Sequence, residues 1–327
     1  MNGSAALVGY IAAASIVLLF VLGGLATPTD HDWLRSRTGV SRGVAGGIVV
    51  VLLVLVGALG VVGRFPRTEA GLEAAFLPGV LVGVGLFGLA VGVANGRTWV
   101  RFRRRGDTPT GEVAPGPVAV TGRIERADPP TAPFFGGPAV AWEWSVEAKN
   151  RHGTNDEGRR AWSRARTGQG GVPFRLDDGS GPVVVDPTAA RLDVSGKTTE
   201  ERAPDDPPGR AAAVADLDMG GERFRFNERS LAPGETVTVL GVARDVETNE
   251  YRSDAGTGAA DRLASDRGAG VVLDASADEP FVVSDRSRAG TRRRYATRAW
   301  LGGVVGAGTV ALGLRWLLPV FEVPVPV

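Results

Sequence analysis

The chain has 327 residues, of which 37 are basic and 36 are acidic, so its formal net charge is only +1. It contains no cysteine and two histidines, His31 and His152, both of which we expect in polar loops. The absence of cysteine excludes disulfides, thiol nucleophiles, iron–sulfur clusters and thiolate zinc sites within these residues. A zinc site built on two histidines would also need carboxylates, so we expect neither a metal nor a cofactor.

Four apolar segments reach the roughly 20 residues that a helix needs to cross the core of a bilayer. The clearest of them, residues 43–63, carries no charge at all, whereas a soluble helix of that length keeps a polar face. The sequence thus predicts an α-helical membrane bundle of four transmembrane helices, at about residues 5–26, 43–63, 76–96 and 299–320. A cleaved signal peptide is the alternative for the first segment, although the first residues supply no basic charge.

Arginines flank the polar stretch between the third and fourth segments. Arginine is retained on the cytoplasmic side during insertion and is attracted to anionic lipid, so its distribution over the short loops places this stretch in the cytoplasm and both termini outside. At the far end of the fourth segment, Arg315 is expected to snorkel to the outer interface beside Trp316. The arginines that we expect to anchor the membrane interface are Arg101, Arg103, Arg104, Arg105, Arg292, Arg293 and Arg294.

These segments divide the chain into residues 1–106, with three membrane helices, residues 107–285, a cytoplasmic domain, and residues 286–327, with the fourth helix and a short tail. The middle part holds 20 basic and 31 acidic residues, a net charge of −11. An acidic surface repels phosphate, so we expect no nucleic-acid partner. An acid-rich, lysine-poor surface also suits a salt-rich, halophilic cytoplasm, and a melting temperature that did not rise in molar salt would contradict this hypothesis.

The cytoplasmic domain has the pattern of a β-rich fold, for which a small β-barrel is one form. Residues 140–146 alternate apolar and polar side chains, as in a strand with one buried face. Residues 177–181 are predicted to form a hairpin turn rather than a calcium loop. Residues 195–221 and 247–270 are expected to be surface insertions. The other predicted strands lie at residues 117–125, 172–176, 182–185, 222–226, 236–242, 271–273 and 281–284.

Sequence motifs for catalysis or transport are nearly absent. Residues 83–88 match GxGxxG but lie inside the third membrane segment, where a phosphate-binding loop cannot form. The four segments contain no Asp, Glu, Lys or His, which argues against a transporter or channel component, the weaker alternative. Small residues spaced four apart favour close helix packing, either among these helices or in a homo-oligomer. They are Gly79, Gly83, Gly88, Gly92 and Gly96, with Gly43 and Gly47, and Gly302 and Gly306.

Five short pieces of the cytoplasmic domain resemble a known family. They occur in the order found in the GIDE domain, also called the BAM ("beside a membrane") domain, at residues 115–124, 138–142, 173–187, 228–241 and 280–284. They include Pro233-Gly234-Glu235, which is similar to the family's "pGe" segment, and they end before the last membrane segment. The family includes the MULAN/MAPL-type mitochondrial E3 ubiquitin ligases, in which a RING finger recruits the conjugating enzyme. The resemblance therefore implies a RING-type ubiquitin transferase.

The zinc sites of a RING finger cannot be built from a sequence without cysteine. We therefore expect a non-enzymatic multi-pass protein of the cell membrane. Its cytoplasmic domain would serve as a RING-less binding or scaffold module, in membrane protein quality control or stress response, for an unknown protein partner at the lipid bilayer. A membrane-anchored, E3 ubiquitin ligase-like protein is the alternative. The candidate partner-binding loop is residues 128–137, with Phe134 and Phe135, although a core role for one of the two is an equal expectation.

Overall fold

The computed structural model describes residues 38–40, 43, 44, 46–48, 50, 69–126, 128–154, 160–215, 223–245, 271–276 and 279–320. The predicted membrane segment 5–26, most of segment 43–63 and the predicted insertion 247–270 lie outside these residues. The chain divides into two compact units. One comprises residues 1–100 and 293–327, and the other is the β-rich unit of residues 101–292.

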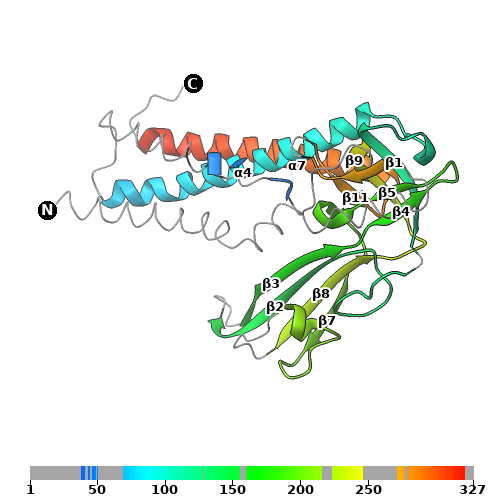
Figure 1. Cartoon of the computed structure of the whole chain (residues 1–327). Helices are drawn as coiled ribbons and strands as arrows, with labels where there is room; N and C mark the ends of the chain where they lie inside the picture. Colours follow the sequence, from blue (N-terminus) through cyan, green and yellow to red (C-terminus); the bar gives the residue numbers. More distant parts are fainter. Residues whose placement is uncertain are drawn as a thin grey trace. The chain divides into compact units, whose positions relative to one another are not determined.

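Two long helices, α4 (Glu69–Arg104) and α7 (Arg288–Val320), flank the β-rich unit in the sequence (Figure 1). Both are long and apolar enough, by length and composition, to cross a membrane. They contain the predicted segments 76–96 and 299–320 and extend beyond them through their arginines. Ser287 caps the start of α7, because its Oγ accepts a hydrogen bond from the Gly290 N–H at 3.3 Å. The structure thus shows two of the four predicted helices.

Glycines allow α4 and α7 to pack backbone against backbone (Figure 1). A Cβ atom built on Gly92 would lie 2.6 Å from the Gly303 nitrogen, and one built on Gly302 would lie 2.6 Å from the Gly92 nitrogen. A Cβ atom on Gly306 would meet the Leu89 nitrogen at the same distance. The small-residue spacing predicted close helix packing, and in this pair it operates within one chain. Gly79, in contrast, has no atom within 4 Å of its added Cβ.

Five strands of the β-rich unit close into a small barrel in the order β1-β4-β5-β10-β9, with β9 pairing back onto β1. The pairing of β1 with β9 is antiparallel and runs from Gly116↔Ala243 to Arg123↔Thr236. The opposite edge of β9 pairs with β10 and β11, and β11 pairs in parallel with β6. The strands are β1 (Gly116–Glu125), β4 (Phe174–Asp177), β5 (Val183–Val185), β6 (Arg191–Asp193), β9 (Thr236–Asp245), β10 (Val271–Asp274) and β11 (Val282–Ser284).

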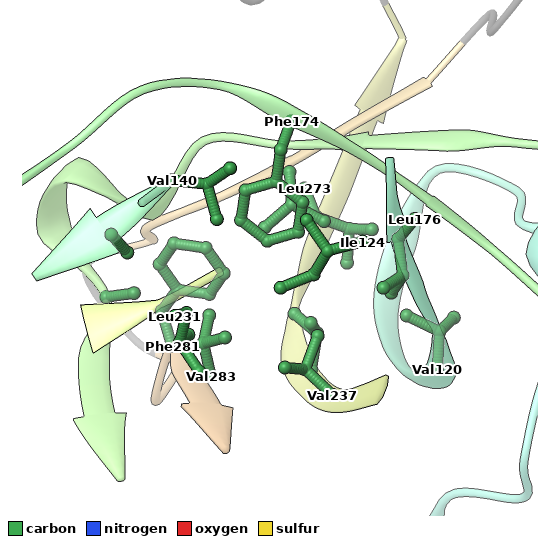
Figure 2. Packing of buried hydrophobic residues seen from close by; sticks show 14 of the residues in the cluster. Val120, Ile124, Val140, Phe174, Leu176, Leu231, Val237, Leu273, Phe281 and Val283 are labelled. Carbon is green, nitrogen blue, oxygen red and sulfur yellow. The ribbon is translucent and has the colours of Figure 1, made fainter. Parts of the chain in front are cut away.

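The barrel core consists of aliphatic side chains and two phenylalanines (Figure 2). Alternate residues of the strands point inward, as the period of a strand requires. The Phe281 ring occupies the space that the missing side chain of Gly241 leaves, since a Cβ atom there would lie 2.8 Å from the ring. The members labelled in Figure 2 are Val120, Ile124, Val140, Phe174, Leu176, Leu231, Val237, Leu273, Phe281 and Val283.

Four further strands form an antiparallel sheet in the order β3-β2-β8-β7 (Figure 1). They are β2 (Ala141–Thr154), β3 (Arg160–Gly171), β7 (Thr198–Arg202) and β8 (Phe224–Leu231). Val140, just before β2, and Leu231, at the end of β8, belong to the barrel core. These two residues therefore join the second sheet to the barrel.

The small barrel and the strand over residues 140–146 are confirmed, and Asp177–Gly181 joins β4 to β5. The strand predicted at 222–226 is instead β8, which continues to Leu231. The interpretation of residues 195–221 as an insertion is partly wrong, because this range contains β7 and the short helix α5 (Ala211–Ala215), whose Ala211 is fully buried. Two short 3-10 turns, η1 (Thr110–Glu112) and η2 (Pro187–Ala189), complete the unit.

Candidate interaction surfaces of the β-rich unit

One face of the four-stranded sheet is apolar and is covered by tryptophans from β2. Trp144 lies over Gly168 and Trp142 over Gly170, both on the neighbouring strand β3. A Cβ atom on Gly170 would lie 2.7 Å from the Trp142 Nε1, and one on Gly168 would collide with the Trp144 indole. The two glycines therefore allow the indoles to lie flat across β3, an arrangement that covers glycine backbone with aromatic surface.

Phe134 completes the aromatic cluster on this face. Its ring centroid lies 5.2 Å from that of Trp144 and 5.5 Å from that of Phe226, in tilted and edge-to-face geometry. Phe134 is only 1% exposed, whereas Phe135 is half-buried at the margin of the cluster. Phe134 is therefore a core residue, and the predicted exposed loop offers Phe135 alone as an accessible aromatic side chain.

A buried carboxylate holds the loop in place. The Glu228 Oε2 accepts a hydrogen bond from the Phe134 N–H at 2.6 Å, and its carboxylate also accepts one from Phe135. Burial raises the pKa of Glu228 above its ordinary value of 4.5, while the two backbone hydrogen bonds act in the opposite direction. Glu228 is thus an acceptor for two backbone donors that burial would otherwise leave unsatisfied.

The segment that leads into α5 fastens the same loop from the other side. The Arg210 N–H donates to the Pro133 carbonyl at 2.9 Å. Gly209 has a φ of +50° and a Cβ atom there would collide with the Phe134 carbonyl, so a larger residue at this position would push the two segments apart. The loop of residues 128–137 is therefore fixed by β8 and by the approach to α5.

The opposite face of the sheet carries a polar ladder across its four strands. The Arg225 guanidinium on β8 lies 2.7 Å from the Glu201 carboxylate on β7 and 3.3 Å from Glu147 on β2. It also lies 4.2 Å from the ring centroid of Trp162 on β3, and the Lys149 Nζ is 5.8 Å from that ring. The hydrogen bond between Arg225 and Glu201 lowers the pKa of Glu201 and raises the pKa of Arg225.

Further along the ladder the contacts are neutral or buried. The Asn227 Nδ2 donates to the Ser145 Oγ at 3.3 Å, and the Thr199 Oγ1 donates to the Asn227 Oδ1 at 3.0 Å. Arg229 lies 3.6 Å from Glu143, a carboxylate whose side chain is only 8% exposed. The polar face therefore runs from a buried end near the barrel to an end at Trp162 where half-buried charges surround an aromatic ring.

Three arginines at the two ends of the unit form ion pairs with its acidic residues. Glu279 binds Arg101 at 2.7 Å and Arg105 at 3.1 Å. Arg288, in the first turn of α7, binds Asp107 at 3.1 Å and donates to the carbonyls of Phe102 and Arg105. These bonds tie the end of α4, the start of α7 and the loop before β11 together. The predicted anchors Arg103, Arg104, Arg292 and Arg293 are exposed, and Arg294 is half-buried.

Buried hydroxyl groups connect the first turn of α7 to the barrel. The Thr291 Oγ1 donates to the Ser284 Oγ on β11 at 3.0 Å, and the Thr238 Oγ1 on β9 donates to the Arg286 carbonyl at 3.0 Å. Thr238, Ser284 and Thr291 are all fully buried. The start of α7 is therefore part of the β-rich unit, in agreement with the division of the chain at residue 292.

The turn between β4 and β5 binds η1 through a second carboxylate. Asp178 accepts hydrogen bonds from the Thr110 Oγ1 at 2.8 Å and the Ser180 N–H at 2.9 Å. These hydrogen bonds, chiefly from Ser180 and Thr110, hold the pKa of Asp178 well below its ordinary value. This arrangement closes a turn, and among the described residues no group of three His, Asp or Glu side chains could hold a metal ion.

The fold defines a class of protein. It is a β domain with two lobes, the barrel and the four-stranded sheet, and in the chain it is preceded by one long apolar helix and followed by another. Residues 145–253 match the model of the GIDE family, described as "E3 Ubiquitin ligase", so this chain contains a GIDE domain. The match covers the four-stranded sheet from the middle of β2, the barrel strands β4, β5 and β9, and strand β6. Comparison with curated proteins and with solved structures gave no match.

Proposed function

We propose that this protein is a membrane-anchored, non-enzymatic binding module, in which the GIDE domain holds a protein partner near the cytoplasmic surface of the cell membrane. Three ion pairs support this proposal: Arg101 and Arg105 with Glu279, and Arg288 with Asp107. They fix the ends of two helices long and apolar enough to cross a membrane to the body of the domain. Such helices on both sides of the β-rich unit in the chain would anchor it to the membrane.

The polar face of the four-stranded sheet is the surface that supports binding best. At its Trp162 end it combines an aromatic ring, the Arg225 guanidinium and carboxylates from two other strands. Aromatic residues and arginine are the residue types that dominate the energies of protein interfaces. The half-buried Phe135 on the opposite face is the second candidate contact, as the sequence predicts.

Photo-crosslinking in native membranes tests this assignment. A crosslinking amino acid at Trp162 is expected to capture a discrete partner, while one at Glu125, exposed on barrel strand β1, is the matched control. The additional change Arg225→Glu, which leaves the crosslinker in place, is expected to abolish the product, because it reverses the charge beside the ring. Equal capture at Trp162 and Glu125 would refute the surface assignment.

The cellular setting is part of the same proposal. The exposed arginines at the membrane ends of the domain support a cytoplasmic domain with both termini outside. Because the chain has no cysteine, a single introduced thiol reports its side without background labelling. A Glu125→Cys variant in sealed, oriented vesicles is expected to react only from the cytoplasmic side. We include in this proposal a role in membrane protein quality control or stress response, which the family resemblance supports.

An E3 ubiquitin ligase-like function is the second candidate, and the description of the matching family model favours it. This function would require the domain to engage a conjugating enzyme without zinc-bound RING sites, since the chain has no cysteine. Purified chain in nanodiscs, mixed with activating and conjugating enzymes, is expected to form no additional ubiquitin conjugates. A robust product that depended on the chain would replace the binding-module proposal.

A further inference from the structure

The register of α4 against α7 places Arg315 at a depth that the sequence alone does not reveal. At one end of the pair, Gly96 faces Ala299, whose Cβ lies 3.7 Å from an added Cβ. At the other end, a Cβ on Gly313 would lie 2.9 Å from the Pro78 carbonyl oxygen and from the Val82 nitrogen. The helices are therefore antiparallel, and residues near 80 in α4 are level with Gly313 in α7.

In this register, the charged residues that end the apolar runs of the two helices lie at the same height at one end of the pair but not at the other. Arg97 in α4 is the direct neighbour of Gly96, and Arg298 in α7 is the direct neighbour of Ala299, so both lie level with this contact. Arg315 comes two residues after Gly313, which puts it level with Pro78. The first charged residue of α4 in that direction is Glu73, five residues further on, or about 7 Å at the rise of an α-helix.

The apolar lengths of the two helices differ accordingly. Between Glu73 and Arg97, α4 has 23 residues without charge, about 35 Å of helix. Between Arg298 and Arg315, α7 has only 16 such residues, about 24 Å. A typical hydrocarbon core is about 30 Å thick, so the uncharged run of α4 spans it, whereas the uncharged run of α7 before Arg315 falls short. The side chain of Arg315 is exposed on the helix pair, as is Trp316, which is 49% exposed.

We propose that Arg315 binds lipid headgroup phosphates below the normal level of the leaflet at the C-terminal end of α7 and so thins the bilayer locally. This inference rests on the proposed membrane anchoring of the chain. A guanidinium presents paired donors that fit a phosphate, and a charge held at this depth is stabilised when headgroups and water move toward it. The exposed Trp316 fits the interfacial position that tryptophan prefers. A helix shorter than the bilayer is accommodated by such thinning.

Thiol accessibility in bilayers of defined thickness tests the proposal. The full-length chain with Leu314→Cys, its only thiol, is reconstituted into phosphatidylcholine vesicles and treated with a membrane-impermeant maleimide. In bilayers of ordinary thickness the thiol is expected to react readily beside Arg315 and about fivefold or more slowly after Arg315→Leu. In short-chain, already thin bilayers the two rates are expected to converge. Arg315→Lys is expected to give an intermediate rate, because lysine snorkels but lacks the bidentate geometry.

A second thiol separates failure of this inference from failure of the membrane proposal. Val305 lies in the middle of the apolar run and is 60% exposed on the helix pair. In a spanning helix a Val305→Cys thiol stays unreactive in all these vesicles, and ready labelling would overturn the membrane proposal itself. If Val305→Cys is protected while Arg315→Leu leaves the labelling of Leu314→Cys unchanged in bilayers of ordinary thickness, Arg315 does not thin the bilayer.

Discussion

The barrel and the four-stranded sheet of the β-rich unit bury their apolar side chains in different ways. The barrel closes on itself, so its strands enclose most of a core made of aliphatic side chains and two phenylalanines. The four-stranded sheet remains open, with β3 and β7 as edge strands, and its aromatic core needs a cover made of the loop at Phe134 and α5. Closure removes edges, whereas an open sheet keeps them. The open sheet, with its unpaired edges, is the lobe on which we propose that a partner binds.

The largest effect is expected from removing the cover of the sheet. Phe134→Ala deletes a fully buried ring that contacts Trp144 and Phe226, and should lower the free energy of unfolding by about 4 kcal/mol. Hydrogen exchange of the full-length chain in nanodiscs should show faster exchange in β2, β7 and β8, with the barrel strands still protected. Equal loss of protection in both lobes would show that they unfold as one unit.

A matched deletion in the barrel should act differently. Leu273→Ala removes a fully buried side chain of β10 and should cost about 3 kcal/mol through the cavity that it leaves. Because β9 and β10 close the barrel, and Val140 and Leu231 join it to the sheet, faster exchange is expected in both lobes. If hydrogen exchange became faster in the barrel alone, the stability of the sheet would not depend on the barrel, and this prediction would be wrong.

The two lobes should also respond to pH with opposite sign, first through Glu228. Because burial raises its pKa above 4.5, the folded sheet binds this proton more tightly than the unfolded chain does. Its contribution to stability is complete below pH 4.5 and declines as the pH rises through the raised pKa. Glu228→Gln keeps an oxygen acceptor without the charge, so urea unfolding of this variant should lose that decline. An unchanged pH profile would exclude Glu228 as its source.

The smallest effect on stability is expected from Asp178, in the barrel turn between β4 and β5. Its dependence on pH is opposite to that of Glu228. Hydrogen bonds from Ser180 and Thr110 lower its pKa below the ordinary value of 3.8. Its contribution to stability is therefore present above pH 3.8 and is lost as the pH falls toward the lowered pKa. Asp178→Asn should reduce stability slightly at neutral pH and weaken the acid dependence. Thermal unfolding measured below pH 4 and at pH 7 checks both, with Asp177→Asn in the same turn as the control.

The parts of this fold that the sequence predicts are those in which each strand shows its own burial pattern. Residues 140–146 alternate clearly, and the valines of β1 and β9 do so as well. Strand β3 escapes prediction because its apolar face is supplied by Trp142 and Trp144 from β2, which lie over glycines that carry no signal of burial. The edge strand β7 escapes prediction because its Thr and Glu side chains are largely exposed.

The candidate surfaces show the same limit. Phe134 and Phe135 stand out as a pair in the sequence, but only the fold shows which of them is buried. The role of Glu228 depends on the Phe134 N–H, a donor 94 positions away in the sequence, and no local sequence pattern predicts such a partner. The polar ladder likewise joins four strands in an order that cannot be read along the chain. Sequence patterns thus identify elements, while the contacts between distant elements have to come from the structure.

Strand β9 pairs with β1 on one edge and with β10 and β11 on the other, and this has a consequence for folding during synthesis. Strand β1 can form hydrogen bonds with β9 only after residues 236–243 have been synthesised, more than 110 residues later. At about 5–20 residues per second, that delay is of the order of 6–24 s. During this time the edge of β1 that will pair with β9 has no partner strand. Mutations that slow synthesis between these strands should therefore raise aggregation without changing the stability of the finished protein.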